Sequence, residues 1–267
     1  MAMDISYYWK NKKGRSELAA IHTADMEKNF HEEIQKAIKN STIYSEDSDF
    51  VPTNIIAPER VMAAGLVAQD SVAAIMNSAQ GKTAVLNFAS YKEPGGGFMV
   101  GSRAQEESLC HESFLYNVLR QFQYYYDWNN QHKNLGLYLN RAIYTPNVRF
   151  ERDGQVEYCD VITCAAPNYS VGKKYGNIDP ATNSKYLDAR IKFVLSIAAE
   201  QGVDTLILGA FGCGVFAQDA TEVMEIFKKY LSTEFKCFDK VIFAIPSDVH
   251  SENYTKAYNV LIGEKED

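Results

Sequence analysis

The chain has 267 residues, of which 46% are hydrophobic and 23% charged, so it is long enough to bury a sizeable core and ordinary for a globular protein. Its formal net charge of -7 argues against general attraction to nucleic acid or to an anionic membrane, so a polyanionic ligand must be held locally. We find no cleavable signal pattern and no apolar run long enough to cross a bilayer, and therefore expect a cytoplasmic protein.

The first part of the chain predicts helices and short extended segments. Apolar residues between positions 15 and 38 recur at helical spacing, which favours one amphipathic helix or a broken pair. The elements expected next are a short strand with an acidic loop over 41–49, an extended piece over 51–57, and a helix over 70–79. We expect residues 1–59 to be an N-terminal helical extension packed on a core of residues 60–267.

The middle of the chain centres on a buried strand over 83–88 and a helix from Gln105 through Leu119. Residues 123–133 are dense in Tyr and Trp among polar residues, and predict either a stacking platform or an irregular loop that caps the core. The elements expected further on are strands over 142–145, 148–150 and 160–166, a hairpin turn at Asp153-Gly154, and a polar loop over 168–184.

The last third alternates plainly between helices and strands. We expect a helix over 185–201 capped by Asn183 or Ser184, a strand over 203–209, a glycine-containing loop over 210–217, a helix over 219–231, a strand over 240–245 and a helix over 249–262. This alternation predicts an α/β protein whose largely parallel sheet is covered by helices on both faces. Ligands of such sheets bind at the carboxyl ends of the strands, so the loops after Phe88, Ala166 and Leu208 are the candidates.

The five cysteines give no sign of a metal site or of a disulfide framework. They are an odd number, scattered through apolar segments without the spacing and the neighbouring histidines of a metal site. We therefore expect reduced, buried cysteines in an intracellular protein that uses no metal and no other cofactor. The five are Cys110, Cys159, Cys164, Cys213 and Cys237.

The loop after the strand over 83–88 combines features of a binding site. Pro94 ends regular structure, and three glycines at 95–97 allow conformations and close approaches that a Cβ would forbid. Gln-Glu-Glu at 105–107 then opens a helix, where carboxylates suit the positive end of the helix dipole. The combination predicts a ligand-binding loop with candidate acid/base groups. The alternative is a plain strand-to-helix connection with favourable helix-start chemistry.

A second glycine-containing loop, residues 209–216, leads into the helix expected from Asp219. Its glycines expose successive amides, which together with the helix N-terminus predict an anion site. The loop lacks the Gly-Lys-Ser/Thr ending of a triphosphate loop and the spacing of the dinucleotide fingerprint, so a diphosphate is the predicted ligand. The alternative is a tight turn beneath a helix, in which case Phe216 is core rather than a stacking surface.

The pattern of three glycines, a short spacer and Gln-Glu-Glu resembles the signature of poly(ADP-ribose) glycohydrolases. Segments 86–90, 104–110 and 163–168 are similar to the bacterial-type branch of that family, and loop 209–216 resembles the diphosphate-binding loop of macrodomains, the fold of the family. The resemblance implies a macrodomain-like three-layer α/β/α fold with a mixed, largely parallel central sheet. It also implies hydrolysis of the ribose-ribose O-glycosidic bond of poly(ADP-ribose), from chain ends, with release of ADP-ribose.

The resemblance assigns roles to residues of both loops. Glu107 would be the acid/base, Glu106 would orient the ribose hydroxyls, and Gln105 would support the loop. This chemistry needs a protonated acid at the leaving oxygen, and two adjacent carboxylates beside a diphosphate raise at least one pKa. The other substrate-binding residues are Asn87 and Ala89 at the terminal ribose, Gly95, Gly96 and Gly97 near the scissile bond, Phe98 shielding it, and Gly209, Ala210, Phe211, Gly212, Cys213, Gly214, Val215 and Phe216 at the diphosphate.

Several charged residues and one thiol are weaker candidates. The cations Lys92, Arg103, Lys173 and Lys174 are either phosphate contacts or ordinary surface charges. Cys110 and His111 are not expected to act as nucleophile and base, because adjacent residues on a helix do not face each other. The same geometry leaves open that Glu106 is only a solvated charge.

Two other functions remain as alternatives. One is a module that binds ADP-ribose without cutting it, although the intact Gln-Glu-Glu at 105–107 argues against it, since such a reader has no need of an acid/base. The other is a hydrolase of the same fold that acts on an ADP-ribosyl linkage to protein or DNA. The expected partners are poly(ADP-ribose) or ADP-ribose, with ADP-ribosylated protein as a further candidate; no membrane and no general nucleic-acid binding are expected.

Overall fold

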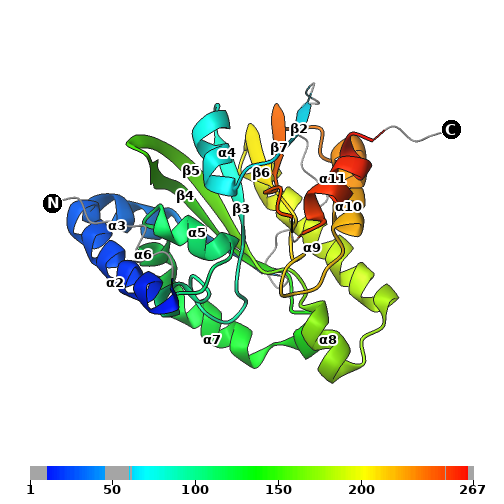
Figure 1. Cartoon of the computed structure of the whole chain (residues 1–267), viewed down its shortest axis with the longest axis horizontal. Coiled ribbons are helices and arrows are strands. Elements are labelled where there is room, and N and C mark those ends of the chain that lie inside the picture. The colour runs from blue at the N-terminus through cyan, green and yellow to red at the C-terminus, as the bar shows by residue number, and fades with distance from the viewer. Residues whose placement is uncertain (1–10, 46–59, 61, 250, 264–267) are drawn as a thin grey trace.

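The computed structural model describes residues 11–45, 60, 62–249 and 251–263. Its centre is one sheet built from β1 (Thr42–Ser45), β2 (Ala63–Val67), β3 (Thr83–Phe88), β4 (Arg141–Arg152), β5 (Gln155–Cys164), β6 (Thr205–Leu208) and β7 (Lys240–Ala244). The order across the sheet is β1-β4-β5-β3-β6-β7-β2. From β5 to β2 neighbouring strands are parallel, whereas β4 is antiparallel to both β1 and β5. The predicted mixed, largely parallel sheet is confirmed (Figure 1).

Helices cover both faces of the sheet. One face carries α9 (Pro180–Glu200), α10 (Ala220–Thr233) and α11 (Asn253–Leu261); the other carries α2 (Lys12–Asn29), α3 (His31–Asn40), α4 (Ser71–Ser78), α5 (Gln105–His111) and α6 (Leu115–Leu119). Side chains of a strand alternate between faces, so Ala84 and Leu86 of β3 join the first core and Val85 joins the second. The two cores confirm the predicted three layers, and Figure 1 shows the helices of the two outer layers on either side of the sheet.

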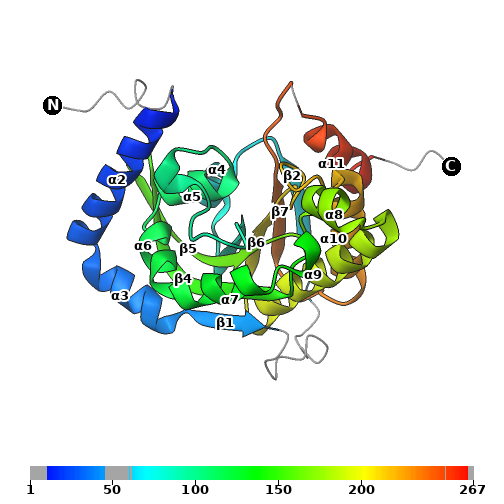
Figure 2. The same ribbon diagram turned by 90° about the horizontal axis from the view of Figure 1, so that it is seen from below.

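Short helices close the end of the molecule drawn lowest in Figure 1. They are η1 (Phe98–Val100), η2 (Arg120–Phe122), α7 (Gln123–Gln131), η3 (Asn134–Gly136) and α8 (Tyr169–Gly176). Figure 2 views the molecule from this side, with α7 in front. Tyr125 and Tyr126 of α7 are buried in the core, so this segment caps the core as one alternative had it, but as a helix rather than an irregular loop.

Three helix boundaries differ from the prediction. The helix expected from Gln105 through Leu119 is broken, because Ser113 leaves the helix to form a β-bridge with Phe150 and its hydroxyl accepts a hydrogen bond from the Leu115 N–H. The predicted polar loop over 168–184 contains α8 and the start of α9. The helix α9 begins at Pro180 with Asp179 as its cap. Proline is well tolerated at the first position of a helix.

The other predicted helices and strands were confirmed only in part. The amphipathic segment near the N-terminus is a broken pair, α2 and α3, with the break at Phe30. The strands expected over 142–145 and 148–150 are one strand with an irregular register between Thr145 and Val148. No prediction was made for β2, an exposed edge strand of Ala and Gly with weak strand signal. The extended piece expected over 51–57 lies outside the described residues.

The N-terminal segment is integrated into the rest of the molecule. Its helices α2 and α3 pack on η1, α6 and β4, and β1 adds an edge strand to the sheet by pairing with β4. The boundary at residue 59 lies outside the described residues and stays a prediction. In the described part of the chain, no helix is long and apolar enough to cross a membrane.

The cysteines are all free, as expected, but only some of them are fully buried. Cys110, Cys159 and Cys164 are buried, whereas Cys213 and Cys237 are partly exposed. The prediction that all five are buried was therefore wrong for two, which lie in loops at the margins of the core.

Candidate active site

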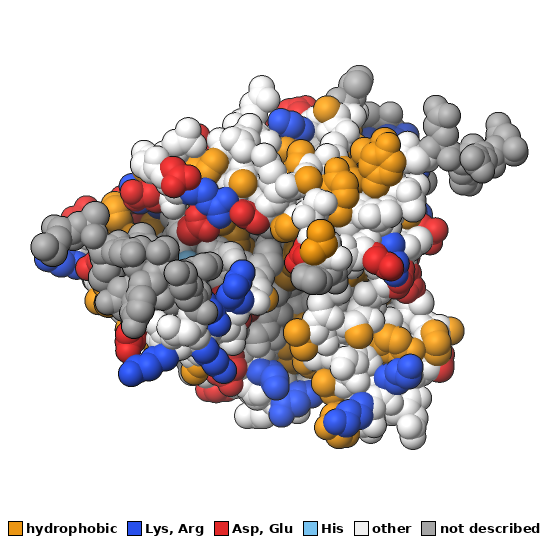
Figure 3. Space-filling view, in the orientation of Figure 1, with side chains coloured by type: hydrophobic (Ala, Val, Ile, Leu, Met, Phe, Trp, Pro, Cys, Tyr) orange, Lys and Arg blue, Asp and Glu red, His pale blue; other side chains and the backbone are white. Residues whose placement is uncertain are grey.

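The loops after β3 and β6 meet across a cleft of about 650 Å³. The predicted site residues that line it are Ala89, Gly96, Gly97, Gln105, Glu106, Glu107, Ala210, Phe211, Gly212, Gly214, Val215 and Phe216. The predicted site residues that do not line it are Asn87, Gly95, Phe98, Gly209 and Cys213. Segments from two distant parts of the sequence thus form one site, and the space-filling view shows the molecular surface hollowed near its middle (Figure 3).

The glycine loop brings its backbone against the two acids. Gly96 has a φ of +58°, and a Cβ there would lie 2.7 Å from Glu106 Oε2 and 2.8 Å from Glu107 Oε1. Glycine therefore serves two purposes at this position, because it permits the left-handed conformation and leaves room for the carboxylates. Although Glu106 and Glu107 are neighbours on α5, both side chains reach this one loop.

Only one of the two carboxylate oxygens of Glu107 is hydrogen-bonded to protein in the described part of the chain. Its Oε1 accepts a hydrogen bond of 2.8 Å from the Gly97 N–H. Its Oε2 is buried and has no partner among the described residues, although the side chain lines the cleft. A buried unpaired acceptor is costly in a folded protein, so an oxygen kept in this state at a cleft is a candidate for contact with a ligand.

Glu106 is held by both oxygens. Its Oε2 accepts 2.7 Å from the Ser90 N–H and its Oε1 accepts 3.2 Å from Asn87 Nδ2. Burial raises its pKa to about 8; the two hydrogen bonds oppose the rise and the nearby charge of Glu107 adds to it. The raised pKa expected for one of the two carboxyls therefore belongs to Glu106. With 3% of its surface exposed, Glu106 is not a solvated charge.

Gln105 joins the end of β3 to the start of α5. Its Oε1 accepts 2.8 Å from the Phe88 N–H, while its Nε2 donates 2.8 Å to Leu86 O and 3.0 Å to Ser71 Oγ. Every hydrogen-bonding atom of this amide is engaged with protein. Gln105 thus fixes the position from which the following two glutamates project.

In the loop after β6, Gly212 is required by the backbone conformation and the close packing, whereas Gly214 faces open space. Gly212 has a φ of +78°, and a Cβ there would lie 2.7 Å from Ala166 Cβ, whereas a Cβ on Gly214 would meet nothing within 4 Å. The first amides of α10 are already occupied, because Asp219 accepts from the Thr221 N–H at 2.8 Å. Any anion bound here must therefore use amides of the loop more than those of the helix.

Phe98 takes a different place from the one its predicted role requires. It is fully buried, with ring centroids 4.6 Å from His111 and 5.0 Å from Tyr116. It packs beneath the glycine loop and does not line the cleft. Cys110 is equally buried and its pKa is raised well above the usual value by burial, which agrees with rejecting it as a nucleophile.

Sequence patterns did not single out one wall of the cleft. Tyr91 and Tyr138 stack there at 4.1 Å, and Tyr138 adopts a φ of +60°. Beneath them Arg190 is fully buried and donates to Asn140 Oδ1 at 2.7 Å and to Ala165 O. Arg190 lies in the middle of a long helix, so only the folded structure reveals that it holds these loops together.

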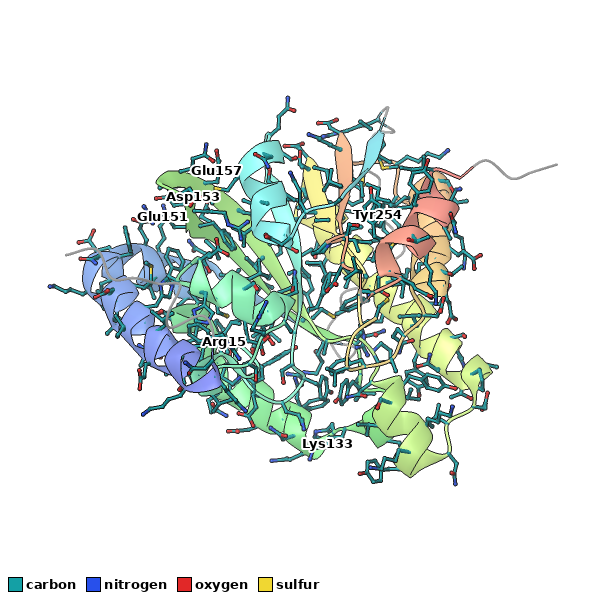
Figure 4. The ribbon with its side chains drawn as sticks, in the orientation of Figure 1. Arg15, Lys133, Glu151, Asp153, Glu157 and Tyr254 are labelled. Atoms are coloured by element: carbon teal, nitrogen blue, oxygen red, sulfur yellow. The ribbon has the colours of Figure 1, made fainter. Side chains whose placement is uncertain are left out.

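The N-terminal helix α2 braces the glycine loop from outside. Arg15 Nε donates 2.8 Å to Gly101 O, and Ser16 Oγ donates 2.6 Å to Met99 O. Gly101 has a φ of +74°, and a Cβ there would overlap the carbonyl of Lys12. Figure 4 shows Arg15 near the end of α2 that meets this loop. The loop is therefore held between α5 and α2.

A second cleft, of about 430 Å³, continues from the first. The residues that line both are Phe88, Arg103, Ala104, Gln105 and Ala210. Beyond them it extends to Asp70, which caps α4, to Asp248, which precedes α11, and to Asn253, the first residue of α11. The two clefts together offer room for an elongated ligand. Within the described residues, no group of three or more His, Cys, Asp or Glu side chains is placed to hold a metal ion.

Comparisons with known proteins agree on one family. The model of the microbial-type poly(ADP-ribose) glycohydrolase (PARG) catalytic domain matches residues 16–153, more than half of the 267-residue chain. Among solved structures, the PARG of Thermomonospora curvata bound to the inhibitor ADP-HPD is similar at 25% identity and a TM-score of 0.80, covering 93% of this chain and 99% of that one.

The PARG of Deinococcus radiodurans in complex with ADP-ribose is similar at 30% identity and a TM-score of 0.78, covering 86% of this chain and 97% of that one. A search of curated proteins returned no match.

Proposed function

Because the chain belongs to the microbial-type poly(ADP-ribose) glycohydrolase family, we propose that it hydrolyses the ribose-ribose O-glycosidic bond of poly(ADP-ribose) and releases ADP-ribose. The observation that carries the assignment of residues is the state of Glu107: one oxygen is fixed by Gly97, and the other is unpaired at the cleft among the described residues. A group with this geometry can exchange a proton with a substrate oxygen without first breaking a hydrogen bond to protein.

In the first step, Glu107 donates its proton to the leaving oxygen as the bond to the anomeric carbon breaks. Positive charge develops on an oxocarbenium-like ribose, next to a carboxyl group that has just become negative. In the second step, the same carboxylate takes a proton from water, and the hydroxide adds to the anomeric carbon. Glu107 thereby returns to its protonated form, and no other acid is consumed.

Glu106 has a different role in this proposal. Because its pKa is raised to about 8 by burial, Glu106 is mostly uncharged at neutral pH and adds little repulsion to the carboxylate that Glu107 forms on giving up its proton. Its carboxyl group is fixed by Ser90 and Asn87, and lines the cleft. We assign it to orient the ribose hydroxyls. Asn87 then acts on the ribose through Glu106 rather than by direct contact.

The two connected clefts support an extended pose for the ADP-ribose unit. The diphosphate would lie against the amides of the loop that contains Gly212 and Gly214, with Arg103 between the clefts as a counter-charge. The adenosine would occupy the second cleft, whose lining beyond the shared residues includes Asp248, Ser251 and Asn253. Gly212 shapes the loop, and open space at Gly214 lets a ligand approach the backbone.

The test pairs wild-type protein with Glu107→Gln on labelled poly(ADP-ribose), mono-ADP-ribosylated protein and ADP-ribosylated DNA side by side. We expect wild type to cleave the polymer, and Glu107→Gln to lose about 1,000-fold or more in turnover while binding ADP-ribose in calorimetry as wild type does. Glu225→Gln, the same change on the exposed surface of α10, is the matched control.

Each other outcome points to a different function. Tight ADP-ribose binding by wild type with uncleaved polymer would identify a reader. Cleavage of the protein or DNA linkage in place of the polymer would identify a hydrolase of another bond. A fully active Glu107→Gln would remove Glu107 from the mechanism.

Attack from chain ends is a finer part of the proposal and rests on the resemblance to the bacterial-type branch. Early products should be single ADP-ribose units, whereas long oligomers at early times would contradict it. ADP-ribosylated protein as a physiological target, residence in the cytoplasm, and the division into an extension of residues 1–59 on a core of 60–267 are proposals as well. Fractionation of cells and recovery of targets on Glu107→Gln protein would test the first two.

A further inference from the structure

We infer that the surface beside the reactive end of the cleft binds the part of poly(ADP-ribose) that remains attached to the bond being cleaved. We call this surface the lysine rim; it consists of Lys133, Lys173, Lys174 and Tyr175, with Leu135 between them. The inference rests on the proposed function and adds a binding site for the substrate beyond the unit that is released.

The chemistry of the substrate sets the end at which the remaining polymer leaves the cleft. The bond that breaks joins the terminal ribose to the next unit, so the polymer extends away from the adenosine of the released unit. That adenosine is assigned to the second cleft, at one end of the site. The other end is lined by Lys92, Tyr138 and Asn168, which the second cleft does not reach. The remaining polymer therefore leaves past these three residues.

Hydrogen bonds join this exit to the lysine rim. The Asn168 N–H donates 2.8 Å to Gly136 O in η3, and Asn168 Oδ1 accepts 3.0 Å from the Val171 N–H at the start of α8. On the opposite side, Asn130 Nδ2 near the end of α7 donates 2.9 Å to Lys92 O. The end of α7, η3 and α8 thus form one continuous surface that begins where the polymer leaves.

The lysine rim carries positive charge on a chain with a net charge of -7. Lys133, Lys173 and Lys174 are exposed, and none of them has an ion-pair partner in the part of the chain that the structure describes. Figure 3 shows Lys and Arg side chains gathered over the lower half of this face, and Figure 4 places Lys133 past the end of α7, toward α8. Each polymer unit carries a diphosphate, so the rim and the polymer are complementary in charge.

Tyr175 adds an aromatic surface that could stack on a base. It is 71% exposed, and Lys174 Nζ lies 4.9 Å from its ring centroid. Leu135, which is 59% exposed, lies close to Gly176 and adds apolar surface next to Tyr175. An exposed aromatic ring beside cations is the arrangement by which proteins hold single nucleotide chains, with bases on the ring and phosphates on the cations. We assign Tyr175 to an adenine of the remaining polymer.

The experiment measures binding of labelled poly(ADP-ribose) and of ADP-ribose to protein that carries Glu107→Gln, which leaves the polymer intact. The triple variant Lys133→Glu/Lys173→Glu/Lys174→Glu should weaken polymer binding about tenfold and reduce the slope of log Kd against log salt by about two. Tyr175→Ala should weaken it about fivefold, and Tyr175→Phe should restore it. ADP-ribose binding should not change in any of these variants.

Matched controls separate the lysine rim from general effects of charge. Lys28→Glu/Lys36→Glu/Lys39→Glu makes the same change in net charge at exposed positions of α2 and α3, and Tyr258→Ala removes a tyrosine exposed on α11. Both should bind polymer as the parent protein does. An equal loss in the control triple, or no loss in the rim triple, would overturn the inference.

Three further outcomes are decisive. If wild type releases ADP-ribose from polymer ends and the rim triple does so with unchanged KM, the proposed function stands and the lysine rim is overturned. If single-stranded DNA of matched length binds the rim as tightly as the polymer, the surface is a general nucleic-acid site and the inference is also overturned. Failure of wild type to bind ADP-ribose would overturn the proposed function itself.

Discussion

The two glycine loops that face each other across the cleft use glycine for different reasons. In the loop after β3, a Cβ on Gly96 would collide with the protein's own carboxylates, at 2.7 Å and 2.8 Å. In the loop after β6, Gly212 is crowded by Ala166, but a Cβ on Gly214 would meet nothing within 4 Å. The first loop is filled by the protein, whereas the second keeps part of its backbone open.

This difference separates two tasks within one site. The loop after β3 is held on one side by Glu106 and Glu107 and on the other by α2, so its glycines fix the acids in place. In the proposed function, the loop after β6 presents its amides to the diphosphate. Adding a single methyl group should therefore damage turnover in the first loop and binding in the second.

Among the changes that test this comparison of the two loops, Gly96→Ala is expected to have the largest effect. The methyl group would displace both carboxyls, and a shift on the order of 1 Å costs about 100-fold in catalysis, so kcat should fall by about that factor. ADP-ribose binding should fall much less. The control is Gly154→Ala, at a hairpin turn with a φ of +78° and nothing within 4 Å, where only backbone strain of about 1 kcal/mol is expected. Equal activity of the two variants would show that the loop does not position the acids.

A second comparison lies within the loop after β6. Gly212→Ala should lower the free energy of unfolding by about 2 kcal/mol, because its methyl group would lie 2.7 Å from Ala166 Cβ in a left-handed conformation. Gly214→Ala should leave stability unchanged and raise the Kd for ADP-ribose about fivefold, since the methyl group would enter space open to the diphosphate. Chemical unfolding and calorimetry measure the two quantities. Wild-type affinity in Gly214→Ala would mean that the ligand does not approach this backbone.

The sequence predicts the framework well where local signals are strong. The alternation of strands and helices, the buried strand β3 and the glycine loop with its acids follow from hydrophobic periodicity and from glycine placement, and the structure confirms the sheet they predict. The helix break at Ser113 was not predictable, because it depends on a bridge to Phe150 far along the chain. The edge strand β2 was missed because its pairing with β7 compensates for a weak local signal.

The residues of the candidate site were also predictable only where the sequence signal is local. Glu106, Glu107 and the two glycine loops stand out in the sequence, and the fold brings them to one cleft. Arg190, Tyr91 and Tyr138 do not stand out, since their contribution arises from tertiary contacts between segments that are distant in sequence. Phe98 differs in the other direction: the resemblance assigns it to shield the scissile bond, but its large apolar side chain is buried in the core.

A smaller effect is expected in the pH dependence of stability. Glu106 keeps its proton up to a pKa of about 8 in the native state, against about 4.5 in the unfolded chain, because burial disfavours the charged form. The stabilisation is complete below pH 4.5 and is lost as pH rises toward 8. Between pH 6 and 7 the free energy of unfolding should fall by about 1 kcal/mol more in wild type than in Glu106→Gln. Parallel profiles for the two proteins would contradict the raised pKa.

The smallest expected effect tests the outer support of the loop after β3. Arg15→Ala removes the hydrogen bond to Gly101 O, but Ser16 still holds Met99 O, so kcat should fall only about threefold, with little change in ADP-ribose affinity. Lys13→Ala is the matched control on the same helix, since Lys13 is exposed and forms only a 3.8 Å surface pair with Glu17. A loss of kcat confined to Arg15→Ala would show that α2 stabilises the catalytic loop from outside. Equal rates for both variants would mean that α5 alone positions the acids.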